Sequence, residues 1–510
     1  MLDLSEQAQK DPDRVAVISA SQGLTYGALH QRSQALLSTP TFHHLASESG
    51  GKVFPNANRR VIAFEAHGDL ETFILAHALL DGRFIALPLN PRLTVRERSR
   101  LIDMAGAVLA ERDELGWFVA QTTSGVSRST TPTTAASNGE PFARRDNPAT
   151  ATSIPTSTAS APSAATSRPT ILIATSGSTA DPKLVQLSRQ SLVASAEANA
   201  AHLQLTKEDR WLLSLSLSHI GGYSILTRCL HRGATVVLCE SRPNIDALTN
   251  LVEQHEVTLL SVVPTMLVRL IAHASLQRLK SLRVILVGGA ACPPQLLRKS
   301  RELGLPTLAT YGMSETSSQI ATQPLPDRYR TDEQPDCGFT LGRSEVRVVD
   351  EVIEVRGPTL FDGYVSKTSP LDLQRGTDDE GWFRTGDLGR VTPEGCVTVL
   401  GRGSDRIVTG GENVSSVEVE AELLSQPGIV EVAVLGIPDK EWGQLVAAAI
   451  VPSGEFAQLG SEWFRELSQA LRQNLAAYKC PKSWLCLPEL PRLSTGKLDR
   501  RRIAELFAPR

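Results

Sequence analysis

A segment rich in small hydroxyl residues spans residues 171 to 183 and reads ILIATSGSTADPK. Its apolar start, Ile171–Ile173, predicts a buried strand, and Lys183 closes the segment. Backbone N–H groups of such a loop can fold around an anion, and a lysine adds a point charge, so the segment predicts a phosphate-binding loop. A surface turn is the alternative, and the spacing to Lys183 is not that of a Walker loop. The small residues are Thr175, Ser176, Gly177, Ser178 and Thr179.

Two acidic residues lie in stretches that could complete a nucleotide site. Glu315 stands in YGMSE, close in sequence to the ring of Tyr311 and the hydroxyl of Ser314. Beside a phosphate loop, a carboxylate is the expected ligand of Mg²⁺, which binds oxygen and bridges phosphates. Asp387 ends the stretch WFRTGD, where its carboxylate could accept hydrogen bonds from both ribose hydroxyls. Taken alone, a solvated glutamate and an aspartate in a β-turn are the simpler interpretations.

Glycines and a lysine extend this pattern. Gly288, Gly289 and Ala290 follow a predicted buried strand over residues 284–287. Glycines at the carboxyl end of a strand let a flat ring approach the backbone, although a tight turn is the commoner reason for them. Near the C-terminus, Lys497 follows Ser-Thr-Gly on a loop that could bring its ammonium group to a phosphate. A solubilising basic tail is the alternative there.

The elements that would position these residues alternate between strands and helices, which indicates parallel sheets covered by helices on both faces. Thr94 is expected to cap one of the helices. The predicted strands include residues 61–65, 83–87, 184–187, 234–238 and 259–263, and the predicted helices include residues 70–80, 94–104 and 220–231. Residues 338–400 show short strands between Gly and Asp turns, which favours a β-rich subdomain.

At 510 residues the chain is long enough for two or more domains. The predicted fold class is α/β, with a large N-terminal domain of mixed and parallel sheets over residues 1–401 and a small, mobile α+β domain over residues 402–510. Glycines in residues 400–414 suit a hinge between them. Residues 121–168 are rich in Ser, Thr, Ala and Pro and poor in large apolar residues, so a disordered insertion is expected, most simply a linker without function.

The overall composition is that of a globular protein, with 41% hydrophobic and 21% charged residues. A net charge of -3 without a long basic run gives no electrostatic argument for binding nucleic acid or an anionic membrane. The seven cysteines are scattered without metal-ligand spacing, as expected of reduced thiols. No apolar stretch reaches membrane-spanning length and the N-terminus lacks a signal peptide's apolar core, so a cytoplasmic protein is predicted.

Taken together and in this order, these stretches resemble the adenylate-forming superfamily of acyl-CoA synthetases, adenylation domains and luciferases. The matching motifs are the phosphate loop, YGMSE, WFRTGD, GRGSDRIVTGGENV and STGK. The resemblance covers nearly the whole chain except the insertion. It implies that a carboxylate attacks the α-phosphate of Mg·ATP to give an acyl-adenylate and pyrophosphate, and that a thiol such as CoA then displaces AMP.

The resemblance also implies residue roles. Lys183, Lys497 and Mg²⁺ on Glu315 would stabilise the charge that develops at phosphorus. Asp387 and Arg402 would hold the ribose, and the Gly288–Ala290 turn would lie near the adenine. The nucleotide site would further include Tyr311, Gly312, Ser314 and the small residues of the phosphate loop.

Within the superfamily, four segments are similar to those of the o-succinylbenzoate–CoA ligases of menaquinone and phylloquinone biosynthesis. They are SLSHIGGYSILTRCLHRGATVVL, SVVPTML, RGPTLFDGY and TGGENVSSVEVE. In the first of them His219 is the expected residue that orients the reacting carboxylate, with a packed histidine as the alternative. Two glycines, Gly221 and Gly222, would leave room for a flat ring.

Three rival functions stay open at this point. They are another acyl- or aryl-CoA ligase, a stand-alone adenylation enzyme that loads a carrier protein, and a non-catalytic nucleotide-binding relative. Retention of all the charged motif residues argues against the last.

The sequence departs from the family pattern at three positions. Ala180 replaces the glycine usual in the phosphate loop, Ser404 stands about where many members carry a charged hinge residue, and Ser314 replaces threonine. The expected partners are a small carboxylic acid, ATP and CoA.

Overall fold

The computed structural model describes residues 2–47, 59–113, 116–120, 169–175, 182–239, 244–272, 276–331, 336–366, 373–409, 412–440, 442–454, 456, 460–493 and 497–507. The predicted insertion over residues 121–168 lies outside the described residues. So do Ser176, Gly177, Ser178, Thr179 and Ala180 of the phosphate loop.

Thirteen strands of the described residues follow one another in a hydrogen-bonded path, β16-β17-β20-β21-β15-β14-β13-β12-β11-β9-β10-β1-β2. Neighbours from β1 through β10, β9, β11 and β12 to β13 are parallel, and those from β13 to β16 are antiparallel. The bounds are β1 Val15–Ile18, β2 Gly23–Thr25, β9 Arg210–Leu213, β10 Thr235–Leu238, β11 Leu259–Val262, β12 Val284–Val287, β13 Thr307–Met313, β14 Ser318–Thr322, β15 Asp336–Thr340, β16 Glu345–Val349, β17 Val352–Arg356, β20 Phe383–Val391 and β21 Cys396–Arg402.

A second sheet runs in the order β19-β18-β8-β7-β4-β3-β5-β6 and is parallel in its centre, from β7 to β5. Its bounds are β3 Val61–Glu65, β4 Ile85–Leu89, β5 Val108–Asp113, β6 Gly116–Ala120, β7 Pro169–Thr175, β8 Lys183–Ser188, β18 Gly363–Val365 and β19 Leu373–Gln374. β7 and β8 are antiparallel, so the phosphate-loop segment joins the ends of a hairpin.

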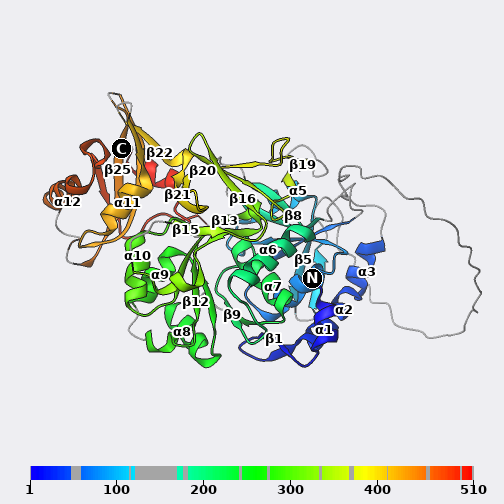
Figure 1. The fold of residues 1–510 in the computed structure, drawn as a ribbon. Helices are drawn as coiled ribbons and strands as arrows, with labels where there is room; N and C mark the ends of the chain where they lie inside the picture. Colours follow the sequence, from blue (N-terminus) through cyan, green and yellow to red (C-terminus); the bar gives the residue numbers. More distant parts are fainter. Residues whose placement is uncertain are drawn as a thin grey trace, which may run out of the picture.

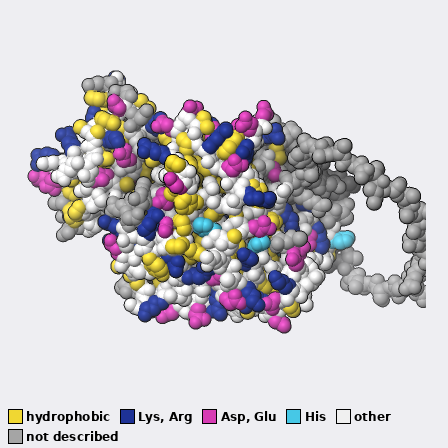
Figure 2. Space-filling model, viewed as in Figure 1, with side chains coloured by type: hydrophobic (Ala, Val, Ile, Leu, Met, Phe, Trp, Pro, Cys, Tyr) yellow, Lys and Arg dark blue, Asp and Glu magenta, His cyan; other side chains and the backbone are white. Residues whose placement is uncertain are grey.

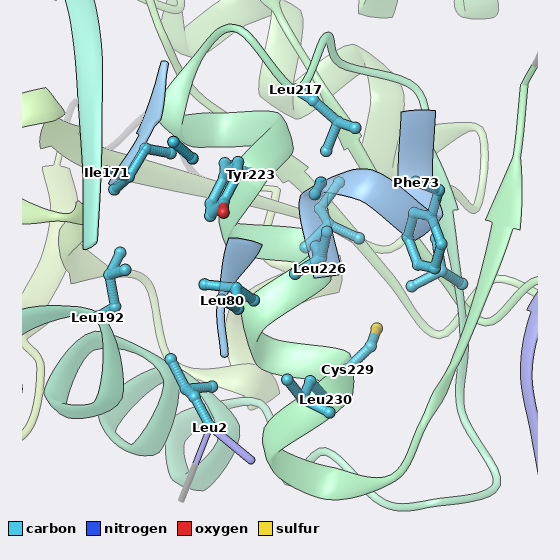
Figure 3. Close-up of a cluster of buried hydrophobic side chains, with 14 of the residues drawn as sticks. Leu2, Phe73, Leu80, Ile171, Leu192, Leu217, Tyr223, Leu226, Cys229 and Leu230 are labelled. Carbon is cyan, nitrogen blue, oxygen red and sulfur yellow. The ribbon is translucent and has the colours of Figure 1, made fainter. Parts of the chain in front are cut away.

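Helices separate and cover the two sheets. The largest core draws side chains from both sheets, from the central helices α6 and α7, and from α2 and α4. Figure 3 shows Tyr223 and Leu226 of α7 with Ile171 on one side and Phe73 on the other, and Leu230 further along the same helix. The bounds are α1 Leu4–Lys10, α2 Tyr26–Leu37, α3 Pro40–Ser47, α4 Leu70–Leu79, α5 Val95–Ala105, α6 Arg189–His202, α7 Ile220–Arg232, α8 Ile245–Gln254, α9 Pro264–Ala272 and α10 Pro294–Glu302.

Successive side chains of a strand point to opposite faces, which explains the layers. Trp211 and Leu213 of β9 lie in the central core, whereas Leu212 packs against α8 and α9 on the opposite face. In the same way α5 covers the outer face of the second sheet through Leu101 and Ile102. Helices therefore lie outside both sheets as well as between them, and the α/β fold class is confirmed (Figure 1).

The C-terminal part carries a smaller sheet with its own cores. Its order is β23-β22-β25-β24, with β26 paired to β25, and helices pack on it as in an α+β unit. The bounds are β22 Arg406–Thr409, β23 Glu412–Ser415, β24 Ile429–Asp439, β25 Gly443–Pro452, β26 Ser483–Cys486, α11 Ser416–Leu424, α12 Gly460–Asn474 and α13 Arg500–Leu506. Figure 1 shows it beside β20 and β21. The boundary at residue 402 and the mobility of this part stay predictions.

Local expectations are met with two differences. Thr94 caps α5, with Thr94 Oγ1 accepting from the Glu97 N–H and the Glu97 carboxylate accepting from the Thr94 N–H. The strand expected at 83–87 runs instead from Ile85 to Leu89, because the residues before Ile85 form the turn after α4, in which Gly82 has a φ of +92°. The strands of residues 338–400 form no sheet of their own: β16, β17, β20 and β21 continue the large sheet, whereas β18 and β19 join the second sheet beside β8.

On the face shown in Figure 2, basic and acidic side chains are interspersed. None of the helices in the described ranges combines the length and apolar character needed to span a bilayer.

Candidate functional site

An aspartate and an arginine are held together on two paired strands. Asp387 of β20 lies opposite Arg402 of β21, and Arg402 Nε is 2.8 Å from Asp387 Oδ1. The hydroxyl of Tyr311, on β13, donates to Asp387 Oδ2 at 2.8 Å. Burial raises the pKa of Asp387, while Arg402 and the Tyr311 hydroxyl act in the opposite direction. Both carboxylate oxygens keep lone pairs for further donors.

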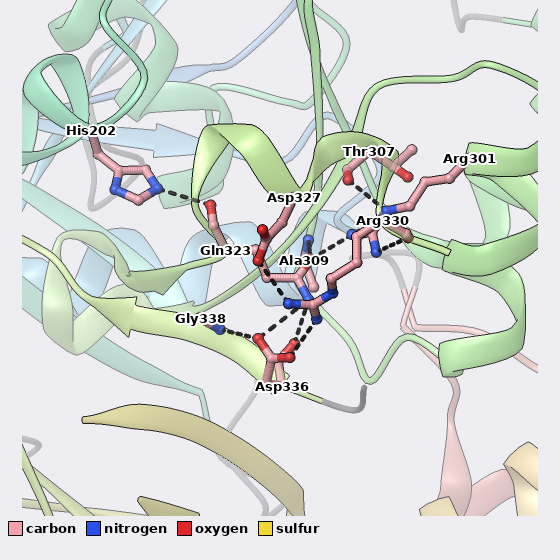
Figure 4. A network of polar contacts seen from close by, with 9 residues as sticks. All are labelled: His202, Arg301, Thr307, Ala309, Gln323, Asp327, Arg330, Asp336 and Gly338. Atoms are coloured by element: carbon pink, nitrogen blue, oxygen red, sulfur yellow. Dashed lines mark hydrogen bonds and ion pairs between the residues drawn. The ribbon is translucent and has the colours of Figure 1, made fainter. Parts of the chain in front are cut away.

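The strand that carries Tyr311 is anchored by a buried polar network (Figure 4). The side-chain oxygen of Gln323 accepts from the Ala309 N–H at 2.9 Å and from Arg301 at 2.6 Å. Its amide nitrogen donates to the Asp336 carbonyl at 3.0 Å, and Arg330 pairs with the Asp336 carboxylate at 2.7 Å. The network joins α10, β13 and β15, so the segment leading to Tyr311 is fixed from several sides.

The predicted magnesium ligand is linked to the phosphate-loop lysine through a tyrosine. Glu315 lies in a short 3-10 helix over Ser314–Thr316, and its Oε1 accepts from the Tyr364 hydroxyl at 2.8 Å. The ammonium group of Lys183 lies 4.8 Å from the centroid of the same tyrosine ring. At the ends of the β7–β8 hairpin, the Thr175 hydroxyl donates to the Lys183 carbonyl at 3.4 Å. Lys183, Thr175 and Glu315 therefore lie around one corner of the site.

Lys497 reaches this site from the C-terminal part. It lies between β26 and α13, and its side chain is exposed to solvent. Even so, the surrounding protein atoms lower the pKa of its ammonium group, and the charge of Arg402 lowers it further. Glu315 and Asp387 act in the opposite direction, which places Lys497 near both acids. Lys497 therefore lies within electrostatic range of the site, and its role there stays a prediction.

His219 lies at the first turn of α7, as its N-cap residue, without a side-chain capping bond. Burial lowers its pKa to about 4, and the charges of Lys497 and Arg92 contribute. The imidazole is therefore neutral at neutral pH. Packing explains the glycine at the nearby position 222, since a Cβ on Gly222 would lie 2.2 Å from the Ser216 carbonyl oxygen. The space at Gly222 is filled by backbone and is not open to a flat ring.

The predicted adenine-side turn follows β12. Gly289 has a φ of +80°, and a Cβ on Gly288 would lie 2.4 Å from the Thr310 hydroxyl, so both positions favour glycine. Gly289 and Ala290 are exposed. In the following hairpin, a Cβ on Gly312 would lie 2.0 Å from the Ser318 carbonyl oxygen, which gives Gly312 a packing role.

The structure therefore gathers the charged residues that the sequence singled out. Around Glu315 and Asp387 lie Lys183, Arg402 and Lys497, while His219 lies close enough to feel the charge of Lys497. The loop residues 176–180 lie outside the described residues, so their roles stay predictions. Ser314 is half-buried beside Glu315.

Two residues with functional potential were not singled out from the sequence. Tyr364 stands in the stretch FDGY, where no local spacing pointed to Glu315 or Lys183. Arg228 of α7 is 2% exposed, and its Nε and Nη2 have no hydrogen-bond partner among the described residues. Its guanidinium carbon lies 5.6 Å from the Trp211 ring centroid, and burial lowers its pKa to about 9.

The donor set fits magnesium bound together with phosphates. Within the described ranges no group of three or more acidic, histidine or cysteine side chains could hold a metal ion alone. Mg²⁺ commonly uses one or two carboxylates and takes its other oxygens from phosphates and water. Glu315, with Oε1 held by Tyr364, supplies such a carboxylate.

Comparisons with known proteins identify the family of this chain. The family model for the AMP-binding enzyme matches residues 4–365, and that for the AMP-binding enzyme C-terminal domain matches residues 418–497. A 2-succinylbenzoate–CoA ligase from Bacillus licheniformis is 32% identical, with 98% of each chain covered.

Two solved structures of the o-succinylbenzoate CoA synthetase from Bacillus subtilis are similar throughout. The complex with the acyl-adenylate intermediate is 27% identical, with a TM-score of 0.75 and coverage of 99% of this chain and 98% of that one. The complex with ATP and a magnesium ion is also 27% identical, with a TM-score of 0.73 and 98% of both chains covered. This chain belongs to the AMP-binding enzyme family.

Proposed function

We propose that this chain joins CoA to 2-succinylbenzoate in an ATP-dependent, AMP-forming reaction that passes through an acyl-adenylate. One observation carries the chemistry: Lys183, Arg402 and Lys497 converge on the acids Glu315 and Asp387 from three separate parts of the chain. The assignment of 2-succinylbenzoate as the substrate is based on two relatives to which the chain is similar along its length, the ligase and the synthetase in complex with the acyl-adenylate.

The residues suit the first half-reaction. A free carboxylate is a poor acyl donor because it lacks a good leaving group. In the acyl-adenylate, AMP is that leaving group. The cations of Lys183 and Lys497 would stabilise charge at the α-phosphate, because preorganised charges act most strongly in a partly desolvated site. Mg²⁺ on Glu315 would neutralise phosphate charge when bound. Asp387, with both oxygens already oriented by Arg402 and Tyr311, would accept from the ribose hydroxyls.

The acid substrate would be oriented by groups on α7. Neutral His219 can donate or accept a hydrogen bond at the reacting carboxylate without adding charge. Arg228 is nine residues further along the helix, about 14 Å and two and a half turns away, so its long side chain would have to reach the acid from the opposite face of α7. A buried guanidinium with unused donors requires an anionic or polar partner. The second carboxylate of 2-succinylbenzoate supplies such a partner, which a fatty acid does not.

We expect Arg228→Met to distinguish the proposed substrate from other aromatic acids. Removing the guanidinium should lower kcat/KM for 2-succinylbenzoate by about a hundredfold, because the ring carboxylate loses its charged donor. With benzoylpropionate, which lacks that carboxylate, the same variant should differ little from the parent. Initial rates of AMP release with both acids, ATP and CoA measure the two values.

A matched arginine is available as the control. Arg283 is an arginine of the same domain whose Nε and Nη2 each donate to a carboxylate oxygen of Asp209, at 2.7 Å. Arg283→Met should change both substrates equally. Equal losses on the two acids with Arg228→Met would contradict the dicarboxylate assignment and favour another acyl- or aryl-CoA ligase. Transfer to a carrier protein in place of CoA would favour the adenylation enzyme.

We also propose a cytoplasmic location. All seven cysteines are free thiols, which suits a reducing compartment. Measuring free thiols in freshly isolated protein, with and without denaturant, would test this.

A further inference from the structure

Tyr364 occupies a position between two groups that approach ATP from different elements. It lies in β18, paired with Val185 of β8, and Lys183 stands two residues before Val185. Residues two apart in a strand share a face, which puts the Lys183 ammonium group over the tyrosine ring, 4.8 Å from its centroid. A cation over an aromatic face is attracted by the ring quadrupole. The ring thereby restricts a long, flexible side chain.

The same segment holds Glu315 at two points. The Phe361 N–H donates to the Glu315 carbonyl at 2.9 Å, and the Tyr364 hydroxyl donates to Glu315 Oε1 at 2.8 Å. Phe361 also packs edge-on against Tyr364, with centroids 4.8 Å apart, and Phe361 is 6% exposed.

One carboxylate oxygen of Glu315 is thus engaged, while Oε2 has no hydrogen-bond partner among the described residues. A metal-binding carboxylate whose other oxygen is hydrogen-bonded is oriented before the metal arrives, and such outer partners strongly affect metal affinity. We propose that Tyr364 is a positioning residue which, on the proposed function, couples the magnesium carboxylate Glu315 to the phosphate-binding lysine Lys183. Its hydroxyl serves the metal side and its ring serves the lysine side.

Two substitutions separate these roles. Tyr364→Phe removes the hydroxyl and keeps the ring, whereas Tyr364→Leu removes both. Calorimetric titration with ATP, once with EDTA and once with excess Mg²⁺, measures the gain in affinity that magnesium provides. We expect Tyr364→Phe to reduce that gain by about tenfold and to leave the affinity with EDTA unchanged. Tyr364→Leu should in addition weaken ATP binding with EDTA by about threefold, because Lys183 loses its aromatic support.

The control is Tyr223→Phe, which removes a buried hydroxyl that has no hydrogen-bond partner among the described residues. It should bind ATP like the parent under both conditions. An unchanged magnesium gain in Tyr364→Phe would overturn the proposal, as would equal losses in both Tyr364 variants with EDTA. If the parent itself binds ATP no better with Mg²⁺, the proposed function fails and not this inference alone. Melting temperatures of all variants identify any that are misfolded.

Discussion

The two sides of the site are held in different ways. On one side, five residues of the large sheets and their loops are bonded to one another. Asp387 pairs with Arg402 and accepts a hydrogen bond from Tyr311, and Glu315 accepts one from Tyr364. On the other side, the ammonium group of Lys497 has neither a hydrogen-bond nor an ion-pair partner among the described residues. Its position depends on how the C-terminal part docks.

This difference suits two tasks: the bonded residues would bind the nucleotide, and Lys497 would act in one chemical step. Groups that hold a nucleotide are needed throughout the reaction and benefit from rigid partners. A cation required in one half-reaction can instead be carried by a part that moves, because its withdrawal leaves the nucleotide-binding groups in place. Lys497, approaching Glu315 and Asp387 without being bonded to either, fits the second description.

Removing Lys497 is the strongest test of this comparison. We expect Lys497→Ala to slow adenylate formation by about a hundredfold or more, because one preorganised charge at the transition state is lost. Thioester formation from supplied acyl-adenylate and CoA should keep its rate. Single-turnover assays of each half-reaction measure both values, and equal slowing of the two would contradict the assignment of Lys497 to one step.

His219 reports on the same lysine through its titration. Its folded pKa of about 4 lies below the ordinary 6.5, so between these pH values the unfolded chain binds a proton that the folded chain does not. Stability from this residue is therefore complete above pH 6.5 and falls as the pH drops toward 4, by at most about 3 kcal/mol. Because Lys497 is one cause, Lys497→Ala should raise the His219 pKa.

NMR titration of the His219 ring in parent and variant measures that shift. Burial remains the largest cause, so the pKa should stay below 6.5 even without the lysine. His77, whose pKa is lowered to about 3 by burial alone, serves as the internal control and should not move. An unchanged His219 pKa in Lys497→Ala would mean that the lysine spends its time away from the site in solution.

How well the sequence predicted each feature depends on how far apart in the chain its interacting residues are. The Thr94 cap and the strands at 61–65 and 284–287 depend on neighbours within a few residues, and they were found from local pattern. Lys497, Asp387 and Arg402 were found because their motifs resemble a family, not because spacing alone could join them. Tyr364 contacts Glu315 across 49 residues, and such a pair leaves no periodic signal.

The packing of glycines was also beyond local pattern. Gly222 was expected to make room for a substrate ring, but the neighbouring turn brings the Ser216 carbonyl into that space. Likewise, Arg228 reads as an ordinary residue of an amphipathic helix. The two sheets that enclose α7 bury its charge, and no carboxylate pairs with it among the residues that the structure describes. Functional significance there comes from burial, which a single helix sequence does not reveal.

A small effect is expected where the two sides of the site are linked at the surface. Arg406 of β22 pairs with Glu351 in the β16–β17 turn at 2.6 Å, and the Glu351 side chain is 68% exposed. Because exposed ion pairs contribute little and are screened by salt, Glu351→Gln should slow adenylate formation by at most about fivefold at low salt and hardly at all at high salt. Glu345→Gln breaks another exposed pair, with Arg356, inside the same hairpin and should have no effect. If both variants slowed adenylate formation equally, or if Glu351→Gln slowed thioester formation as well, the pair would act on the hairpin rather than on docking. A loss confined to adenylate formation and to low salt would instead show that this contact helps bring Lys497 to the nucleotide.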